Sequence, residues 1–368
     1  MNFARAFRLI AALVVMAALA GCTKTVSLTA SPPPTASPSP LPAASSPVPA
    51  ASASAGLWQP PPDAVPSTGN YVYLESDAGD PVGDGHTYSY RPANAKLSVT
   101  AEGGHLSVVV HGDEDWAGDF QLPVGSHELV SAEFDDVHGY SSSVSTRAGL
   151  DWSLNGRSAG LITGWFVVDD VKYVGGALAA VDLRFEQHHA GDQPALHGQI
   201  HWDAPKVTRT PVPVPSFSPG AWRPARGATP STGSYVYLVS DPGDYVGAGK
   251  TYTYTPGDAE ITVKAEGGLI SVTVIGDEWW SGDFKFPDSF ANAQVGHYGD
   301  LKRYPFNNPV RGGLDWSGEG RGSNELTGWF DVDRVTYQGT SLASLDLRFE
   351  QHSEGKAPAL HGEIHWSQ

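Results

Sequence analysis

The chain of 368 residues carries 40 Asp and Glu against 23 Lys and Arg, so its formal net charge is −17. This acidic balance argues against nucleic acid and anionic lipid headgroups as partners, and it permits cations, neutral sugars or basic proteins. Cys22 is the single cysteine, which excludes an internal disulfide and a thiolate metal site.

The first 21 residues are typical of an export signal. Arg5 and Arg8 precede an apolar run, residues 9–20, that is too short to span a membrane. The run ends in Leu19-Ala20-Gly21-Cys22, which resembles the lipobox of bacterial lipoproteins. The resemblance implies cleavage before Cys22 and acylation of that residue. Because each buried methylene contributes about 0.8 kcal/mol, two or three acyl chains would hold the protein to a lipid bilayer.

An acylated Cys22 places the protein in the cell envelope. Thr23 follows it, and by analogy with bacterial lipoproteins the absence of Asp there implies the outer membrane where two membranes are present. In an envelope with one membrane, we expect the outer face of the plasma membrane. Removal of the two signal arginines makes the mature formal charge (23 − 2) − 40 = −19.

Two segments of low apolar content divide the rest of the chain. Residues 22–57 are rich in Pro, Ala and Ser and predict a disordered tether. Residues 204–221 are rich in Pro and predict a semi-rigid linker with about 3.1 Å of length per residue. The remaining residues, 58–203 and 222–368, are expected to be two domains.

These two domains are copies of one another. Trp58 recurs as Trp222 (222 − 58 = 164), and His201-Trp202 recurs at the same offset as His365-Trp366. No net insertion or deletion separates the first pair from the last. Each copy has about 145 residues, which is enough to bury its own core.

Both copies consist of short alternating or β-branched runs, without helical periodicity. In copy two such runs are 235–238, 251–254, 261–265 and 270–274, with a Gly267-Gly268 turn between the last two. About nine or ten strands in each copy predict an all-β protein of two tandem β-sandwich domains, jelly-roll-like in connection, with a barrel as the alternative.

The last two strands, 345–352 and 360–366, predict an antiparallel hairpin with one polar face. If His352 lies opposite His361, then Glu350 lies opposite Glu363. That pair would have the short separation of the carboxylates of a retaining glycosidase, although copy one has Gln199 in place of Glu363. The hairpins make these residues ligand-binding candidates: Glu186, His188, His197, Glu350, His352, His361 and Glu363. The alternatives are a zinc site and a polar face whose side chains only pair with one another.

Acidic glycine-rich segments recur at 76–80 and 240–244, and at 112–119 and 276–283. Carboxylates on such loops suit Ca²⁺, although Asp and Gly are also ordinary turn residues. The calcium candidates are Asp77, Asp80, Asp241 and Asp244. No other cofactor is implied.

Trp116 and Trp280 lie in the second pair of acidic segments, where a large ring has no evident core to join. Exposed rings beside carboxylates suit stacking on a sugar. Trp116, Trp280, Asp119 and Asp283 are therefore ligand-binding candidates, with a ring folded into the end of the sandwich as the alternative.

The run from Gly313 to Asn324, followed by 326–330, 347–355 and 358–362, resembles a module of secreted bacterial proteins that has no assigned activity. The module often has cysteines at the positions of Ser323 and Ser353, which implies that these two serines are neighbours. Copy one has Ala159 and His189 there.

Together these features favour an envelope-anchored lipoprotein with two non-catalytic binding modules, for which polysaccharide or cell-wall glycan is the expected ligand. One alternative is a glycoside hydrolase or lyase that acts through Glu350 and Glu363. The other is a structural or protein-binding component of the envelope.

Overall fold

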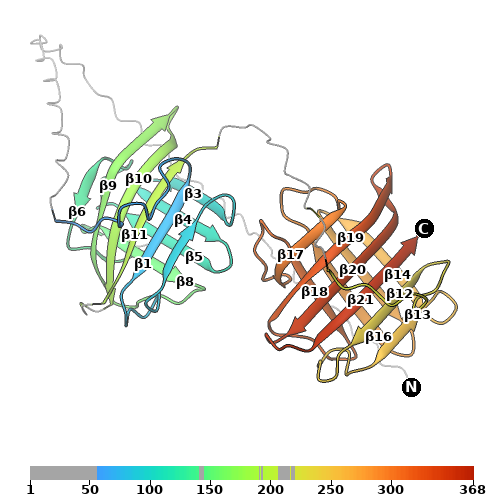
Figure 1. Cartoon of the computed structure of the whole chain (residues 1–368). Helices are drawn as coiled ribbons and strands as arrows, with labels where there is room; N and C mark the ends of the chain where they lie inside the picture. The colour runs from blue at the N-terminus through green and yellow to red at the C-terminus, as the bar shows by residue number, and fades with distance from the viewer. Residues whose placement is uncertain (1–55, 141–144, 190, 192–193, 206–215, 217–219) are drawn as a thin grey trace, which may run out of the picture. The chain divides into compact units, whose positions relative to one another are not determined.

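The computed structural model describes residues 56–140, 145–189, 191, 194–205, 216 and 220–368. The predicted signal peptide, Cys22 and nearly all of the tether lie outside these residues, as does most of the linker. Every regular element in the described part is a β-strand (Figure 1), so the predicted all-β class is confirmed. No helix in this part of the chain has the length and apolar composition needed to span a membrane.

Repeat one (58–203) contains two sheets, with strand orders β2-β1-β11-β10-β9-β6 and β3-β4-β5-β8-β7. All neighbours are antiparallel except β7 and β8. The strands are β1 (Tyr71–Ser76), β2 (Thr87–Tyr90), β3 (Lys96–Glu102), β4 (His105–His111), β5 (Asp115–Gln121), β6 (Ala132–Phe134), β7 (His138–Gly139), β8 (Gly149–Leu154), β9 (Ile162–Val174), β10 (Ala177–His189) and β11 (Ala195–Asp203).

Repeat two (222–368) has the same layers in one continuous sheet, ordered β13-β12-β21-β20-β19-β17-β18-β16-β15-β14. Strand β17 joins the layers because it pairs with both β19 and β18, which approaches the barrel alternative. The strands are β12 (Tyr235–Ser240), β13 (Thr251–Tyr254), β14 (Glu260–Glu266), β15 (Leu269–Ile275), β16 (Trp279–Lys285), β17 (Gly296–Arg303), β18 (Gly313–Gly318), β19 (Leu326–Gln338), β20 (Ser341–Ser353) and β21 (Ala359–Ser367).

Each repeat is a sandwich with its own core between the two layers, which confirms the prediction of two tandem β-sandwiches. Strands β9–β11 and β19–β21 are consecutive neighbours within one layer, here called the long-strand layer. The face of this layer that points away from the core is called the outer face. The predicted turn is also confirmed, since Gly267 and Gly268 both have positive φ, 58° and 71°, as a tight hairpin turn requires.

Ser323 and Ser353 meet as the module resemblance implied. Both are buried, and the hydroxyl of Ser323 donates a 2.8 Å hydrogen bond to that of Ser353. Ser353 ends β20, and Ser323 precedes the neighbouring strand β19. Two residues 30 positions apart in sequence are thus in side-chain contact.

Replacing both serines by cysteine, Ser323→Cys with Ser353→Cys, should therefore create a disulfide in repeat two. Closing a loop of this length stabilises the folded state by about 3–4 kcal/mol in the chain-entropy view. The test is thermal unfolding of residues 58–368, which contain no other cysteine, with and without reductant. A pair of free thiols under oxidising conditions would contradict the prediction.

Candidate functional site

The outer face carries the polar residues of the predicted hairpin. On β20 and β21 the side chains alternate, so Leu347 and Ile364 are fully buried in the core while Glu350 and His361 lie on the outer face. The faces of the hairpin are therefore those that the alternation predicted.

A cluster of one carboxylate and two imidazoles lies on this face in repeat two. Glu350 is opposite His361, with 3.1 Å between its Oε2 and Nδ1 of His361. Nδ1 of His361 makes no hydrogen bond within the described residues, although the carboxylate lies within ion-pair distance. Oε1 of Glu350 accepts a hydrogen bond from Nε2 of His352 at 3.2 Å. Asp241 lies 3.8 Å from Nε2 of His361, so a carboxylate flanks each side of that ring.

The segment that enters repeat two from the linker lies across this cluster. The ring of Trp222 stacks on that of His361, with centroids 5.0 Å apart and planes at 17°. Its carbonyl oxygen accepts a 2.6 Å hydrogen bond from Nη1 of Arg348. Arg348 also donates to Asp331 and Asp333, and its side chain is 1% exposed. A buried guanidinium thus anchors the entering segment to the sheet.

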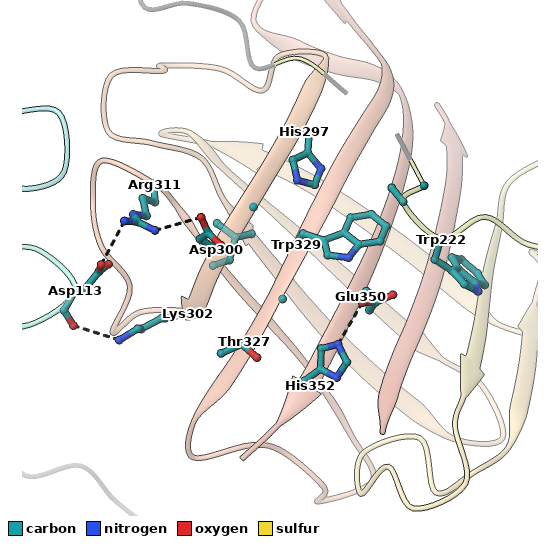
Figure 2. A pocket seen from close by; sticks show the side chains of 15 residues that line it. Asp113, Trp222, His297, Asp300, Lys302, Arg311, Thr327, Trp329, Glu350 and His352 are labelled. Carbon is teal, nitrogen blue, oxygen red and sulfur yellow. Dashed lines mark hydrogen bonds and ion pairs between the residues drawn. The ribbon is translucent and has the colours of Figure 1, made fainter. Parts of the chain in front are cut away.

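A hollow beside Trp222 contains the ring of Trp329, from β19. Figure 2 shows this ring between His297 and Glu350, with Thr327 further along the same strand. Thr327 and Trp329 are two residues apart on β19 and therefore share a face. A Cβ on Gly328, between them, would lie 2.3 Å from the carbonyl oxygen of Glu350. Only glycine allows β19 to approach β20 so closely.

Repeat one has the same cluster. Glu186 lies 3.2 Å from Nδ1 of His197 and accepts a 2.9 Å hydrogen bond from His188. The ring of Trp58 stacks on that of His197, with centroids 5.1 Å apart. Arg184 donates to the carbonyl oxygen of Trp58 at 2.8 Å. The duplicated chain has thus kept both the cluster and the residue that covers it.

The clustered glutamates are held in the ionised form. Contact with His361 lowers the pKa of Glu350 from 4.5 to about 2; burial opposes this shift, and His352 and Trp329 reinforce it. His197 and His188 likewise lower the pKa of Glu186 to about 2, again against burial. A general acid in glycoside hydrolysis needs a raised pKa. These carboxylates are therefore suited to orient the neighbouring rings rather than to donate a proton.

The stability of repeat one should consequently be greatest between about pH 4.5 and 6.5. The pKa of Glu186 is lowered from 4.5, so its contribution is present above pH 4.5 and is lost as the pH falls towards 2. Burial lowers the pKa of His197, but Glu186 and Asp77 outweigh it and raise the pKa above 6.5. The contribution of His197 is therefore present below pH 6.5 and is lost as the pH rises through its folded-state pKa.

Urea unfolding at a series of pH values measures this dependence. We expect Glu186→Gln to remove about 1–3 kcal/mol near pH 5.5 and to flatten the acid limb. An acid limb of the same slope in the variant would show that other carboxylates produce it.

The predicted register of the hairpin is wrong by two residues. His352 is opposite Ala359 rather than His361, and Glu363 is opposite Arg348 rather than Glu350. Glu363 instead accepts a hydrogen bond from the hydroxyl of Tyr235. A shift of two residues leaves every side chain on the same face, so hydrophobic alternation does not distinguish the two registers. The carboxylate pair proposed for a retaining glycosidase is therefore not opposed across the strands.

The prediction that Trp116 and Trp280 are exposed is also wrong. The segments that hold them are strands β5 and β16, and both rings point into the core, 1% and 0% exposed. The indole N–H of Trp116 donates to the hydroxyl of Tyr90 at 2.9 Å. A Cβ on Gly118 would lie 1.7 Å from the ring of Trp152. The glycine of this acidic segment thus serves core packing, and the exposed ring of the segment is Trp279, at 49%.

The acidic residues of these segments lie apart from the cluster. Asp119 is 2.8 Å from His105, and Asp283 accepts a hydrogen bond from Ser271 at 2.6 Å. Both are on the layer opposite the long-strand layer. Two carboxylates face each other in this layer, because Asp283 is opposite Asp315. Burial raises the pKa of Asp315 to about 6, and Asp283 adds to this shift while Arg303 opposes it.

The calcium candidates have partners within the protein. The carboxylates of Asp80 and Asp244 are buried, and each accepts hydrogen bonds from a serine hydroxyl and from backbone N–H groups. Asp77 and Asp241 accept from the backbone N–H groups of Ala195 and Ala359. The described residues contain no group of three or more His, Cys, Asp or Glu side chains arranged to hold a metal ion. Calcium binding stays a prediction.

Sequence reasoning missed the residues that form the hollow. Trp165 and Trp329 were not singled out, because each follows a glycine in an apolar run and resembles a core residue. The usable signal was that each tryptophan is directly followed by a phenylalanine on the same strand. Phe166 and Phe330 are fully buried, so the adjacent tryptophans must point the other way. Comparison of the chain with protein-family models, with curated proteins and with solved structures finds no match.

Proposed function

We propose that this chain is a lipid-anchored envelope protein whose two sandwiches bind glycan on their outer faces. One observation carries the proposal: both copies retain, away from the core, a partly exposed tryptophan beside an ionised Glu-His cluster. An indole face offers a sugar ring a stacking surface, and the neighbouring polar groups offer hydrogen bonds. Thr163 and Thr327, both exposed, add a hydroxyl to each site.

Duplication supports this proposal energetically. Two weak sites joined by a linker bind a repeating polymer with an effective concentration in the millimolar range for a short linker, so avidity exceeds either affinity alone. The Pro-rich linker 204–221 and the tether 22–57 would give the two sites reach from a membrane-bound Cys22. We place the protein accordingly at the membrane surface, facing cell-wall glycan.

A non-catalytic role agrees best with the cluster. The lowered pKa of Glu350 disfavours general-acid catalysis, and Glu363 is engaged with Tyr235. The hydrolase alternative through these two residues therefore receives no support from their geometry.

The test is retention of residues 58–368 on a glycan array and on insoluble cell-wall polysaccharide. Specific retention without release of reducing sugar supports the proposal. Turnover would favour the hydrolase, and a stable protein partner without retention on any glycan would favour the protein-binding role.

A further inference from the structure

The hollow of repeat two and the corresponding surface of repeat one differ in the strand that pairs with β19 or β9, which is β17 in repeat two and β6 in repeat one. At the same offset of 164, residues 133–138 read Glu-Phe-Asp-Asp-Val-His and residues 297–302 read His-Tyr-Gly-Asp-Leu-Lys. With neutral histidine, the first segment carries three negative charges and the second carries one negative and one positive charge. The border of the hollow has thus changed from −3 to 0 between two otherwise matched sites.

This difference is coupled to the buried arginine of each repeat. In repeat two, Asp331 lies 2.7 Å from Nη2 of Arg348, and both side chains are 1% exposed. Repeat one has Val167 at the position of Asp331. There Asp169 chiefly, and Glu133 at longer range, raise the pKa of Arg184 against the effect of burial. Asp169 and its counterpart Asp333 thus pair with the arginine in both repeats, and repeat two adds the buried Asp331 as a second counter-charge.

In repeat two, His297 stands at the position of Glu133. Nδ1 of His297 is 2.7 Å from the buried carboxylate of Asp331, and its ring centroid is 5.8 Å from that of Trp329. A Cβ on Gly299 would lie 2.8 Å from Nε2 of His297, whereas repeat one has the exposed Asp135 there. Lys302 and Arg311 also line the hollow, together with Asp300, whose carboxylate lies 3.4 Å from Nη1 of Arg311. The exchanges of Glu133 for His297, Asp135 for Gly299 and His138 for Lys302 thus remove two exposed carboxylates and add an amine, while Asp300 keeps the carboxylate of Asp136.

We propose that the hollow of repeat two selects glycans that bear carboxylates, whereas the corresponding surface of repeat one does not. This inference rests on the proposed glycan function. The overall charge of −17 repels an acidic polymer, so such a preference requires local cationic groups. The carboxylate of a uronic acid whose ring lies on Trp329 is the ligand group that the border of repeat two fits.

The test uses oligogalacturonate and its methyl ester, which share one backbone and differ in charge. The protein is residues 22–368 with Cys22→Ser, which keeps it in solution. We expect the acid form to bind more tightly by on the order of tenfold, and Trp279→Ala, in the opposite layer of repeat two, to leave this preference unchanged. Giving repeat two the residues of repeat one at four positions should abolish the preference. The substitutions are His297→Glu, Gly299→Asp, Lys302→His and Asp331→Val.

The reverse exchange in repeat one, Glu133→His, Asp135→Gly, His138→Lys and Val167→Asp, should create a second acid-preferring site, and it provides a result even if the first variant fails to fold. Equal binding of the acid and the ester by the unchanged chain, with retention on other glycans, overturns this inference and leaves the glycan function standing. Retention on no glycan overturns both.

Discussion

Replacing Trp165 and Trp329 by alanine together should abolish retention of the chain on its glycan while each sandwich stays folded. Both rings lie on the outer face and are partly exposed, so their removal leaves the cores unchanged. Loss of an aromatic contact surface at a binding hot spot costs roughly 1–2 kcal/mol or more, which is about tenfold for each site. Because the sites act in tandem, the double variant should lose about a hundredfold or more. Affinity electrophoresis of the single and double variants measures the effect.

Trp279→Ala is the matched control for that experiment. Trp279 belongs to the same repeat and is more exposed, at 49%, but it lies on β16, in the opposite layer. Its removal should leave retention unchanged. If Trp279→Ala weakened retention and the pair Trp165→Ala with Trp329→Ala did not, the binding site would lie on the other face of the sandwich.

Arg348→Ala should be the most destabilising single substitution on the outer face. The guanidinium is 1% exposed and neutralises Asp331, which is also 1% exposed. Its loss leaves this buried carboxylate with only the ring of His297 beside it. Breaking one partner of a buried ion pair costs about 3–5 kcal/mol. For a domain of this size that lowers the unfolding temperature of repeat two by about 10 °C. Scanning calorimetry or urea unfolding measures the loss.

Two other arginines serve as controls. Arg334 lies 2.8 Å from Asp346 but is 52% exposed, so Arg334→Ala should cost less than about 1 kcal/mol. Arg184→Ala should fall between the two, because its partner Asp169 is 30% exposed and water can solvate the remaining carboxylate. A loss for Arg348→Ala no larger than that for Arg334→Ala would show that Asp331 is relieved in another way, for instance by protonation.

The candidate site was predictable in part. Alternation along 345–352 and 360–366 correctly separated the core residues from the polar face, since strand side chains alternate with a period of two. The same rule misled where an element was misassigned. The Asp and Gly of the segments around Trp116 and Trp280 predict loops, yet Trp116, Gly118 and Phe120 alternate inward along β5.

The duplicated sequence by itself determined the all-β class, the two tandem sandwiches, the Gly267-Gly268 turn and, through the module resemblance, the contact of Ser323 with Ser353. These properties depend on local pattern or on positions matched between copies. Only the tertiary structure decided that Glu350 meets His361 rather than Glu363, that Trp222 covers the cluster, and that Asp331 pairs with the buried Arg348. Each of these contacts joins residues of different strands or of the entering segment, and strand register and packing between distant segments leave no local signal in the sequence.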